Sequence, residues 1–108
     1  MPEQHFTKQD WTLFSKKIAG WQEAYMAQLI DSYIQLLNTD TNPSDRFWEL
    51  ENRIKHDRKS PGVLLDMSRS NMLYNILALI NNDVITLGDL NDFSDDLKDT
   101  IRYLTERN

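Results

Sequence analysis

The sequence predicts an all-α fold, an irregular bundle of about four helices with one further short helical turn. Three observations lead to this prediction. Apolar residues recur every three or four positions from Trp11 to Leu36. The run from Val63 to Ile80 is the most apolar long stretch, and a helix that is apolar round most of its circumference must be covered by other helices. Short polar segments with the composition of loops and helix caps separate these stretches.

Length and composition fit one globular domain. The chain has 108 residues, of which 40% are hydrophobic and 27% are charged. A chain of this size can bury enough surface to form a core without disulfide or metal cross-links. We expect residues 1–7 to form a flexible leader and residues 8–108 to form a single helical domain.

Composition also argues against several classes of function. The absence of cysteine excludes disulfides, thiolate metal sites and cysteine nucleophiles, and it fits a reducing compartment. The first ten residues lack the apolar core of a secretory signal, and no stretch is long and apolar enough for a membrane span. A net charge of −5 disfavours nucleic acid as a partner. We therefore expect a cytoplasmic protein with no membrane span and no nucleic-acid partner.

The first predicted helix runs to about Asn38, and either Thr7 or Asp10 suits its N-cap. Its apolar stripe widens in the second half, so we expect that half to be the more deeply buried. An unbroken helix of this length spans about 45 Å, whereas a compact domain of this size has a radius of gyration of about 13 Å. Either the helix bends near Gly20, or its first turns extend beyond the domain.

The aromatic start of this helix leaves two alternatives open. Trp11, Phe14 and Ile18 either pack on the C-terminal helix of the same chain or, on an extending helix, contact a partner. The first alternative is favoured. The second is the sequence-based reason to expect a homodimer, or binding to another protein.

The second and third predicted helices are joined by a short connection. Ser44 or Asp45 suits the N-cap of the second helix, after a polar loop. The segment Ser60-Pro61-Gly62 is expected to end it and to start the next, because serine caps helices and proline suits the first helical position. We expect the third helix to run from Val63 to about Asn81 and to be the most buried.

The last part of the chain carries start signals for a short turn and a final helix. Val84 and Ile85 form a short apolar anchor for the core. The segment from Thr86 to Asp89 is a capping-box variant that opens the short turn. Ser94 is expected to cap the last helix, whose core positions are Leu97, Ile101 and Leu104.

Several short runs resemble a family of short helical proteins of unknown function, mostly from Gram-positive bacteria. These runs are Phe47-Trp48-Glu49-Leu50-Glu51, Arg53-Ile54, Asp57, Pro61-Gly62-Val63, Val84-Ile85-Thr86, Asp89-Leu90 and Phe93-Ser94-Asp95-Asp96-Leu97-Lys98. The resemblance extends from about Trp11 to Tyr103 and implies no ligand or catalytic residue. Members often carry the label "multidrug transporter", but a transporter needs spans of about 20 apolar residues, so any link to transport would be regulatory or accessory.

The residues that carry metal or catalytic chemistry form no recognisable motif. His5 and His56 are far apart in the sequence, and neither precedes or follows a plausible nucleophile. A faint calcium-loop pattern ends at Asp89, but it places Ala78 and Ile80 where the first carboxylate ligands belong. We expect no catalytic residue, no metal site and no cofactor.

A small basic patch lies at the end of the second predicted helix. It consists of Arg53, Lys55, Arg58 and Lys59. Cations at a helix C-terminus are favoured by the helix dipole, which explains most of the patch without a ligand. A helix-turn-helix is disfavoured because the helix that follows begins with apolar residues at Val63 and beyond.

The charge distribution is uneven along the chain. Residues 46–59 carry five cations and three acids, whereas residues 83–99 carry six acids and one cation. We expect these segments to face each other, either within one chain or across a dimer.

The sequence thus favours a non-enzymatic interaction or regulatory module. Its candidate interface residues are Trp11, Phe14, Trp48, Arg53, Lys55, Arg58 and Lys59. The alternative is a small-molecule-binding protein or enzyme with a pocket between helices, for which the polar candidates are Asn71, Tyr74 and Asn75.

Overall fold

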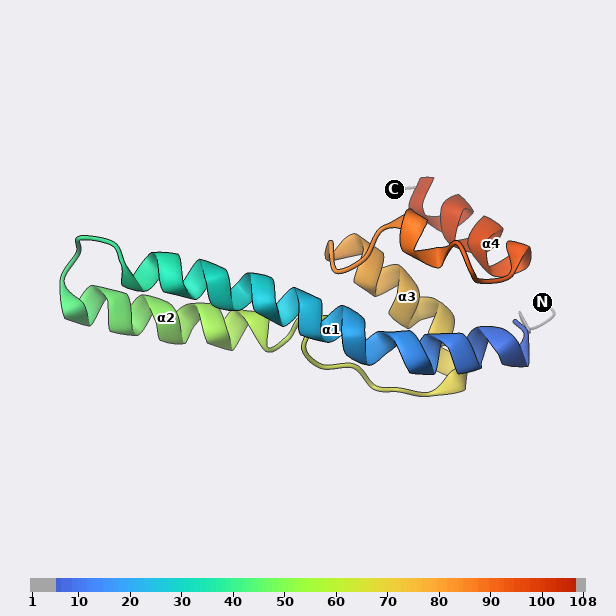
Figure 1. Cartoon of the computed structure of the whole chain (residues 1–108), viewed down its shortest axis with the longest axis horizontal. Helices are drawn as coiled ribbons and strands as arrows, with labels where there is room; N and C mark the ends of the chain where they lie inside the picture. Colours follow the sequence, from blue (N-terminus) through green and yellow to red (C-terminus); the bar gives the residue numbers. More distant parts are fainter. Residues whose placement is uncertain (1–5, 107–108) are drawn as a thin grey trace.

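The computed structural model describes residues 6–106 and confirms the all-α fold (Figure 1). No strand occurs within that range. The helices are α1 (Lys8–Leu37), α2 (Pro43–Asp57), α3 (Met72–Asn81) and α4 (Asp95–Glu106), with 3₁₀ turns η1 (Arg69–Asn71) and η2 (Leu87–Leu90) before α3 and α4. Of the predicted leader, residues 1–5 lie outside the described residues, whereas Phe6 packs against the core and Thr7 caps α1.

The first helix is continuous over 30 residues and passes through Gly20 without a break. Its start is a capping box in which Thr7 Oγ1 accepts from the Asp10 amide at 3.0 Å and the Asp10 carboxylate accepts from the Thr7 amide at 3.3 Å. A glycine inside a helix costs only about 1 kcal/mol relative to alanine. Packing against both halves of α1 outweighs that cost.

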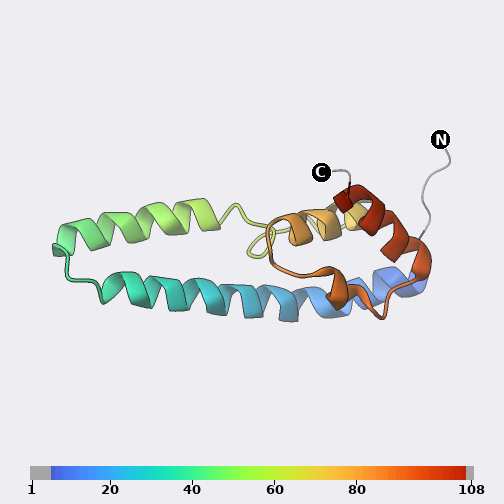
Figure 2. The ribbon, with the colours of Figure 1, turned by 90° about the horizontal axis from the view of Figure 1, so that it is seen from above.

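Two structural units share α1 (Figures 1 and 2). The helix α2 returns antiparallel along the second half of α1, and we call residues 22–57 the hairpin. The helices α3 and α4 pack together beside the first half of α1, and we call residues 72–106 the C-terminal lobe. The molecule measures 56 × 28 × 22 Å, so one end of the long helix α1 extends beyond the rest of the domain. The extending end is the second half of α1, opposite to the end we predicted.

The core lies between the first half of α1 and the C-terminal lobe. Ten apolar side chains are buried there, namely Phe14, Ile18, Met72, Ile76, Leu79, Ile85, Leu90, Phe93, Leu97 and Ile101. The prediction that the second half of α1 is more deeply buried is wrong, since Ile30 and Ile34 are 54% and 51% exposed. A wide apolar stripe measures how much surface a helix offers, whereas burial depends on how many elements cover it. Two helices cover the first half, and α2 runs along the second.

The third predicted helix is wrong in its first part, because α3 begins only at Met72. The Pro61 carbonyl accepts from Gln22 Nε2 at 3.1 Å, and Gly62 lies against the ring of Tyr25. Ser60 Oγ accepts from the Gly62 amide at 3.1 Å, so Ser60 supports a turn and not a helix start. These contacts hold the connection between the hairpin and the lobe against α1, and the chain leaves this turn without helical structure.

Other helix starts are closer to prediction. Asn42 occupies the N-cap position of the second helix without a side-chain capping bond, and Pro43 is the first helical residue, so the helix begins slightly before the predicted Ser44 or Asp45. Ile85 is buried in the core as the predicted anchor. The capping box of Thr86 opens η2, and Ser94 Oγ accepts from the Leu97 amide at 3.2 Å at the start of α4.

Candidate functional site

The aromatic residues at the start of α1 belong to the core of their own chain. Phe14 is fully buried, and Trp11 packs against the core with its ring 6.2 Å from that of Phe14. Trp21 continues the row, with its ring 6.3 Å from Phe93 of the C-terminal lobe. The structure therefore shows that Phe14 and Ile18 pack within their own chain, which is the favoured alternative. Phe14 is not accessible to a partner.

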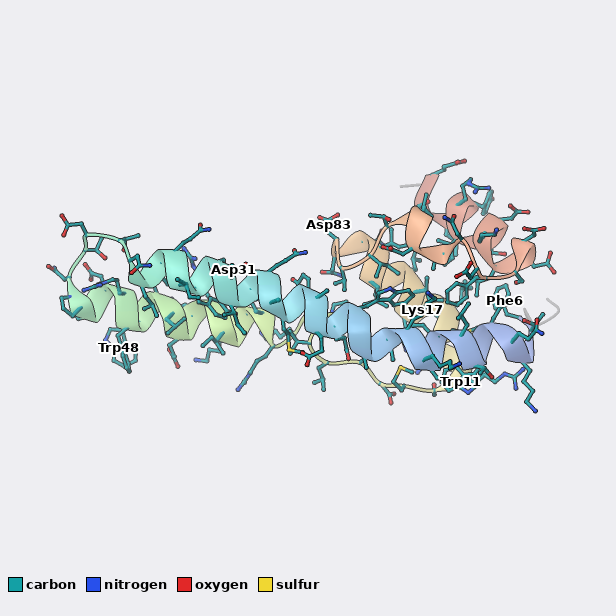
Figure 3. The ribbon with its side chains drawn as sticks, viewed as in Figure 1. Phe6, Trp11, Lys17, Asp31, Trp48 and Asp83 are labelled. Carbon is teal, nitrogen blue, oxygen red and sulfur yellow. The ribbon has the colours of Figure 1, made fainter. Side chains whose placement is uncertain are left out.

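The remaining interface candidates lie on α2 or directly after its C-terminal end. Trp48 is 60% exposed and points away from α1, and its ring meets that of Phe47 edge-on at 5.0 Å (Figure 3). Arg53 Nε donates to Glu49 Oε2 at 3.1 Å, and Lys55 Nζ lies 4.0 Å from Glu51 Oε2. Exposed pairs of this kind contribute little to stability.

Arg58 and Lys59 are exposed at the C-terminal end of α2. The structure thus places the whole basic patch at the base of the hairpin, beside the connection to the lobe.

The hairpin carries a further apolar surface that the sequence interpretation missed. On α1 the half-buried residues Leu29, Tyr33 and Leu36 mark the side toward α2, and on α2 the half-buried residues are Arg46, Leu50, Arg53 and Asp57. The residue directly after each of these in the sequence points about 100° further round its helix. These next residues form a second set on each helix. Its apolar members, which we call the hairpin face, are Ile30, Ile34, Leu37, Phe47 and Ile54, all between 40% and 62% exposed.

The members of the hairpin face lie on one side of the molecule. Two antiparallel helices are related by an approximate twofold axis perpendicular to their common plane, so equivalent rotations from the contact line lead to the same side on both. Ile30 and Ile34 on α1 therefore share a surface with Phe47 and Ile54 on α2. The sequence signal for this face was the widening of the apolar stripe, which we interpreted as deeper burial within the chain.

A hydrogen bond between Tyr33 on α1 and Asp57 at the end of α2 joins the two helices of the hairpin. The Tyr33 hydroxyl donates to Asp57 Oδ2, and Asp57 Oδ1 lies 3.3 Å from His56 Nδ1. Burial, followed by the hydrogen bond to the carboxylate, raises the pKa of Tyr33 from 10.0 to about 12. A group that ionises this far above neutral pH is a structural donor and not an acid–base catalyst at ordinary pH.

A second polar cluster joins the starts of α1 and α4. Asp10 is 2% exposed, and its Oδ1 accepts from the Ser94 amide at 2.8 Å while its Oδ2 accepts from Ser94 Oγ at 2.6 Å. Together with the Thr7 amide, these donors satisfy the carboxylate. The sequence suggested Asp10 only as an N-cap, because its contact with Ser94 joins residues far apart in the chain.

A surface hollow of about 640 Å³ lies beside this cluster. It is lined by Thr7, Lys8, Gln9, Asp10, Thr12, Leu13, Lys16, Asp92, Phe93 and Ser94. The carboxylate of Asp10 already accepts hydrogen bonds from protein donors. It is therefore a structural group and is not placed to exchange a proton with a molecule in the hollow. The other charged groups that line the hollow are Lys8, Lys16 and Asp92.

The residues proposed for an inter-helix pocket lie elsewhere. Tyr74 is 70% exposed, and Asn75 Nδ2 donates to the Asp66 carbonyl at 3.1 Å. Asn71 precedes α3, and its amide donates to Ser68 Oγ. None of these three residues lines the hollow beside Asp10. Within residues 6–106, no cluster of three potential metal ligands occurs.

The two oppositely charged segments do not face each other within the chain. Residues 46–59 lie mainly on α2 in the hairpin, whereas residues 83–99 lie in the C-terminal lobe at the other end of α1 (Figure 1). The intrachain form of that prediction is wrong, because the lobe packs on the first half of α1. The alternative, that residues 46–59 of one chain face residues 83–99 of another across a dimer, stays a prediction.

No described helix is long and apolar enough to cross a membrane. Comparison with known proteins gives no match to a family model, a curated protein or a solved structure.

Proposed function

We propose that this protein is a non-enzymatic interaction module whose hairpin face binds a protein partner. The observation that supports the proposal is the contrast between the two halves of α1. The first half buries its apolar residues under the C-terminal lobe, whereas the second half leaves Ile30 and Ile34 about half exposed beside Phe47 and Ile54. Apolar patches of a few hundred Å² on a soluble domain commonly mark interaction sites.

The geometry of the hairpin supports a protein as the ligand. An elongated, convex pair of helices offers a long apolar strip, which suits the groove or helical face of another protein. Small molecules are bound instead in concave sites that enclose most of their surface. On α2, Glu51 lies between Phe47 and Ile54 on the same side of the helix and is paired with Lys55, and the other exposed charges form the polar rim that protein interfaces commonly have.

A capture experiment with matched surface variants tests this proposal. The variant Ile30→Lys/Ile34→Lys places two charges on the hairpin face, whereas Gln28→Lys/Gln35→Lys adds the same two charges on another side of α1, at exposed positions. Immobilised wild-type protein and the glutamine variant should capture the same proteins from an extract of the source organism, and the isoleucine variant should lose them. Equal capture by all three proteins contradicts a role for the hairpin face.

A further inference from the structure

We infer that the partner of the hairpin face is a second copy of this chain, bound antiparallel so that two hairpins form a four-helix bundle. This inference rests on the proposed function and names its partner. Three properties of the hairpin carry it, namely the area of the face, the order of its side chains along each helix, and the distribution of charge between its two ends.

The hairpin face is large enough for a specific dimer. Its five apolar side chains are between 40% and 62% exposed. With about 150–200 Å² for a fully exposed large apolar side chain, they present roughly 400–500 Å² in each copy. Two copies would remove at most roughly 800–1,000 Å² from water through these side chains, so the flanking polar atoms complete an interface of about 1,000 Å².

The order of side chains on α1 is suited to antiparallel self-association. The apolar positions Met26, Ile30, Ile34 and Leu37 are spaced by four, four and three residues. A twofold axis crossing α1 near residue 32 pairs Ile30 of one copy with Ile34 of the other, and Met26 with Leu37. Both of these α1 pairs are apolar, and each contact is repeated on the other side of the axis, as in an isologous interface.

The charges at the two ends of the hairpin favour the antiparallel arrangement over the parallel one. The tip carries the exposed acids Asp40 and Asp45, and Arg46 Nη1 there donates to the Leu37 carbonyl at 2.7 Å. The base of α2 carries the exposed cations Arg58 and Lys59. Antiparallel packing brings the acidic tip of each copy toward the basic base of the other. A parallel dimer would place like charges together and would crowd the two C-terminal lobes at one end.

The mass of the purified protein in solution tests the dimer directly. Light scattering over a range from low micromolar to near-millimolar concentration should approach twice the chain mass of 12.8 kDa. The variant Ile30→Lys/Ile34→Lys should stay at the chain mass with its helical circular dichroism retained, and Gln28→Lys/Gln35→Lys should behave as wild type. A wild-type mass of one chain at every concentration overturns the inference, as does a dimer that the isoleucine variant leaves intact.

Cysteine cross-linking tests the relative orientation of the two copies, and no native cysteine can form competing disulfides because the chain has none. Equal amounts of Asp40→Cys and Lys59→Cys are mixed and oxidised. An antiparallel dimer should give the mixed disulfide between the two variants, whereas a parallel dimer should give Asp40→Cys linked to itself. Preferential formation of that self-linked product overturns the antiparallel arrangement.

The mass and capture experiments fail in distinguishable ways. A monomeric wild-type protein whose isoleucine variant loses captured proteins rules out the second copy but supports the proposed interaction module. Equal capture by both variants, together with a wild-type mass of one chain at every concentration, contradicts the interaction module itself.

Discussion

Single residues in this protein act mainly through what lies next to them in space, and two of the three glycines show this. Gly62 is buried against Tyr25, and a Cβ built there would lie 2.3 Å from the Tyr25 ring. Gly20 is on the exposed side of α1, where an added Cβ meets nothing within 4 Å. The same substitution should therefore have opposite effects at the two positions.

We expect Gly62→Ala to lower the free energy of unfolding by about 1–3 kcal/mol, because the Tyr25 ring has to move. The matched variant Gly20→Ala should raise it by about 0.5–1 kcal/mol, because alanine favours the helix. Urea denaturation followed by circular dichroism measures both changes. A neutral Gly62→Ala would show that the connection is not packed against α1.

The Tyr33 hydroxyl gives stability that depends on pH at the alkaline end. Its folded-state pKa of about 12 lies above the ordinary value of 10.0, mainly because of burial and then because of the bond to Asp57. A raised pKa means that this contribution is fully present below pH 10 and is lost as the pH rises toward 12. Wild type should lose more stability over this range than Tyr33→Phe, as measured by urea denaturation at each pH.

A spectroscopic control identifies the tyrosine. The ultraviolet difference titration between wild type and Tyr33→Phe isolates this one phenol, and it should show a midpoint near 12. In Asp57→Asn the midpoint should fall, because the carboxylate that favours the neutral phenol is gone. An Asp57→Asn protein with an unchanged midpoint would contradict the contact between α1 and α2.

At the scale of helices, the starts of the elements are fixed by short polar motifs, and one of them also joins two helices. Either Thr7 or Asp10 could be predicted as the N-cap, because both residues lie within one turn, and the structure shows Thr7 as the cap in a capping box with Asp10. The bond from Ser94 to Asp10 could not be predicted, because nothing in the sequence pairs residues 84 positions apart. This bond fixes the start of α4 against the start of α1.

We expect Asp10→Ala to cost about 2–4 kcal/mol, because it removes a buried acceptor of several hydrogen bonds. Ser94→Ala should cost less, since the Ser94 amide still donates to Asp10. In a double-mutant cycle the two substitutions should couple by at least about 0.5 kcal/mol. Additive effects would show that the two helix starts are stabilised independently.

The whole molecule is an extended body with its core at one end. Its radius of gyration is 16.9 Å, against about 13 Å for a compact domain of this length. The C-terminal lobe and the first half of α1 hold the buried apolar side chains of the core, and α2 has no buried residue. Stability should therefore be distributed unevenly, with the hairpin opening more readily than the lobe.

Hydrogen exchange measures this distribution. Amides in α2 should exchange faster than those in α3, and the difference should widen in the monomeric variant Ile30→Lys/Ile34→Lys, where no second copy covers the hairpin face. The variant Gln28→Lys/Gln35→Lys serves as the control for added charge. Equal exchange in α2 and α3 would mean that the protein opens only as one cooperative unit.

The sequence by itself determined the helical class, the start of the first helix at Thr7 or Asp10, the capping box at Thr86, and the core anchor at Ile85. These features depend on residues within one or two turns of each other, so local periodicity and capping chemistry suffice to predict them. Tertiary structure decided where α3 begins, which half of α1 is covered, and that Phe14 is buried while Ile34 is exposed. Those outcomes depend on which elements pack together, and an apolar stripe has the same appearance in a sequence whether its own chain covers it or leaves it open.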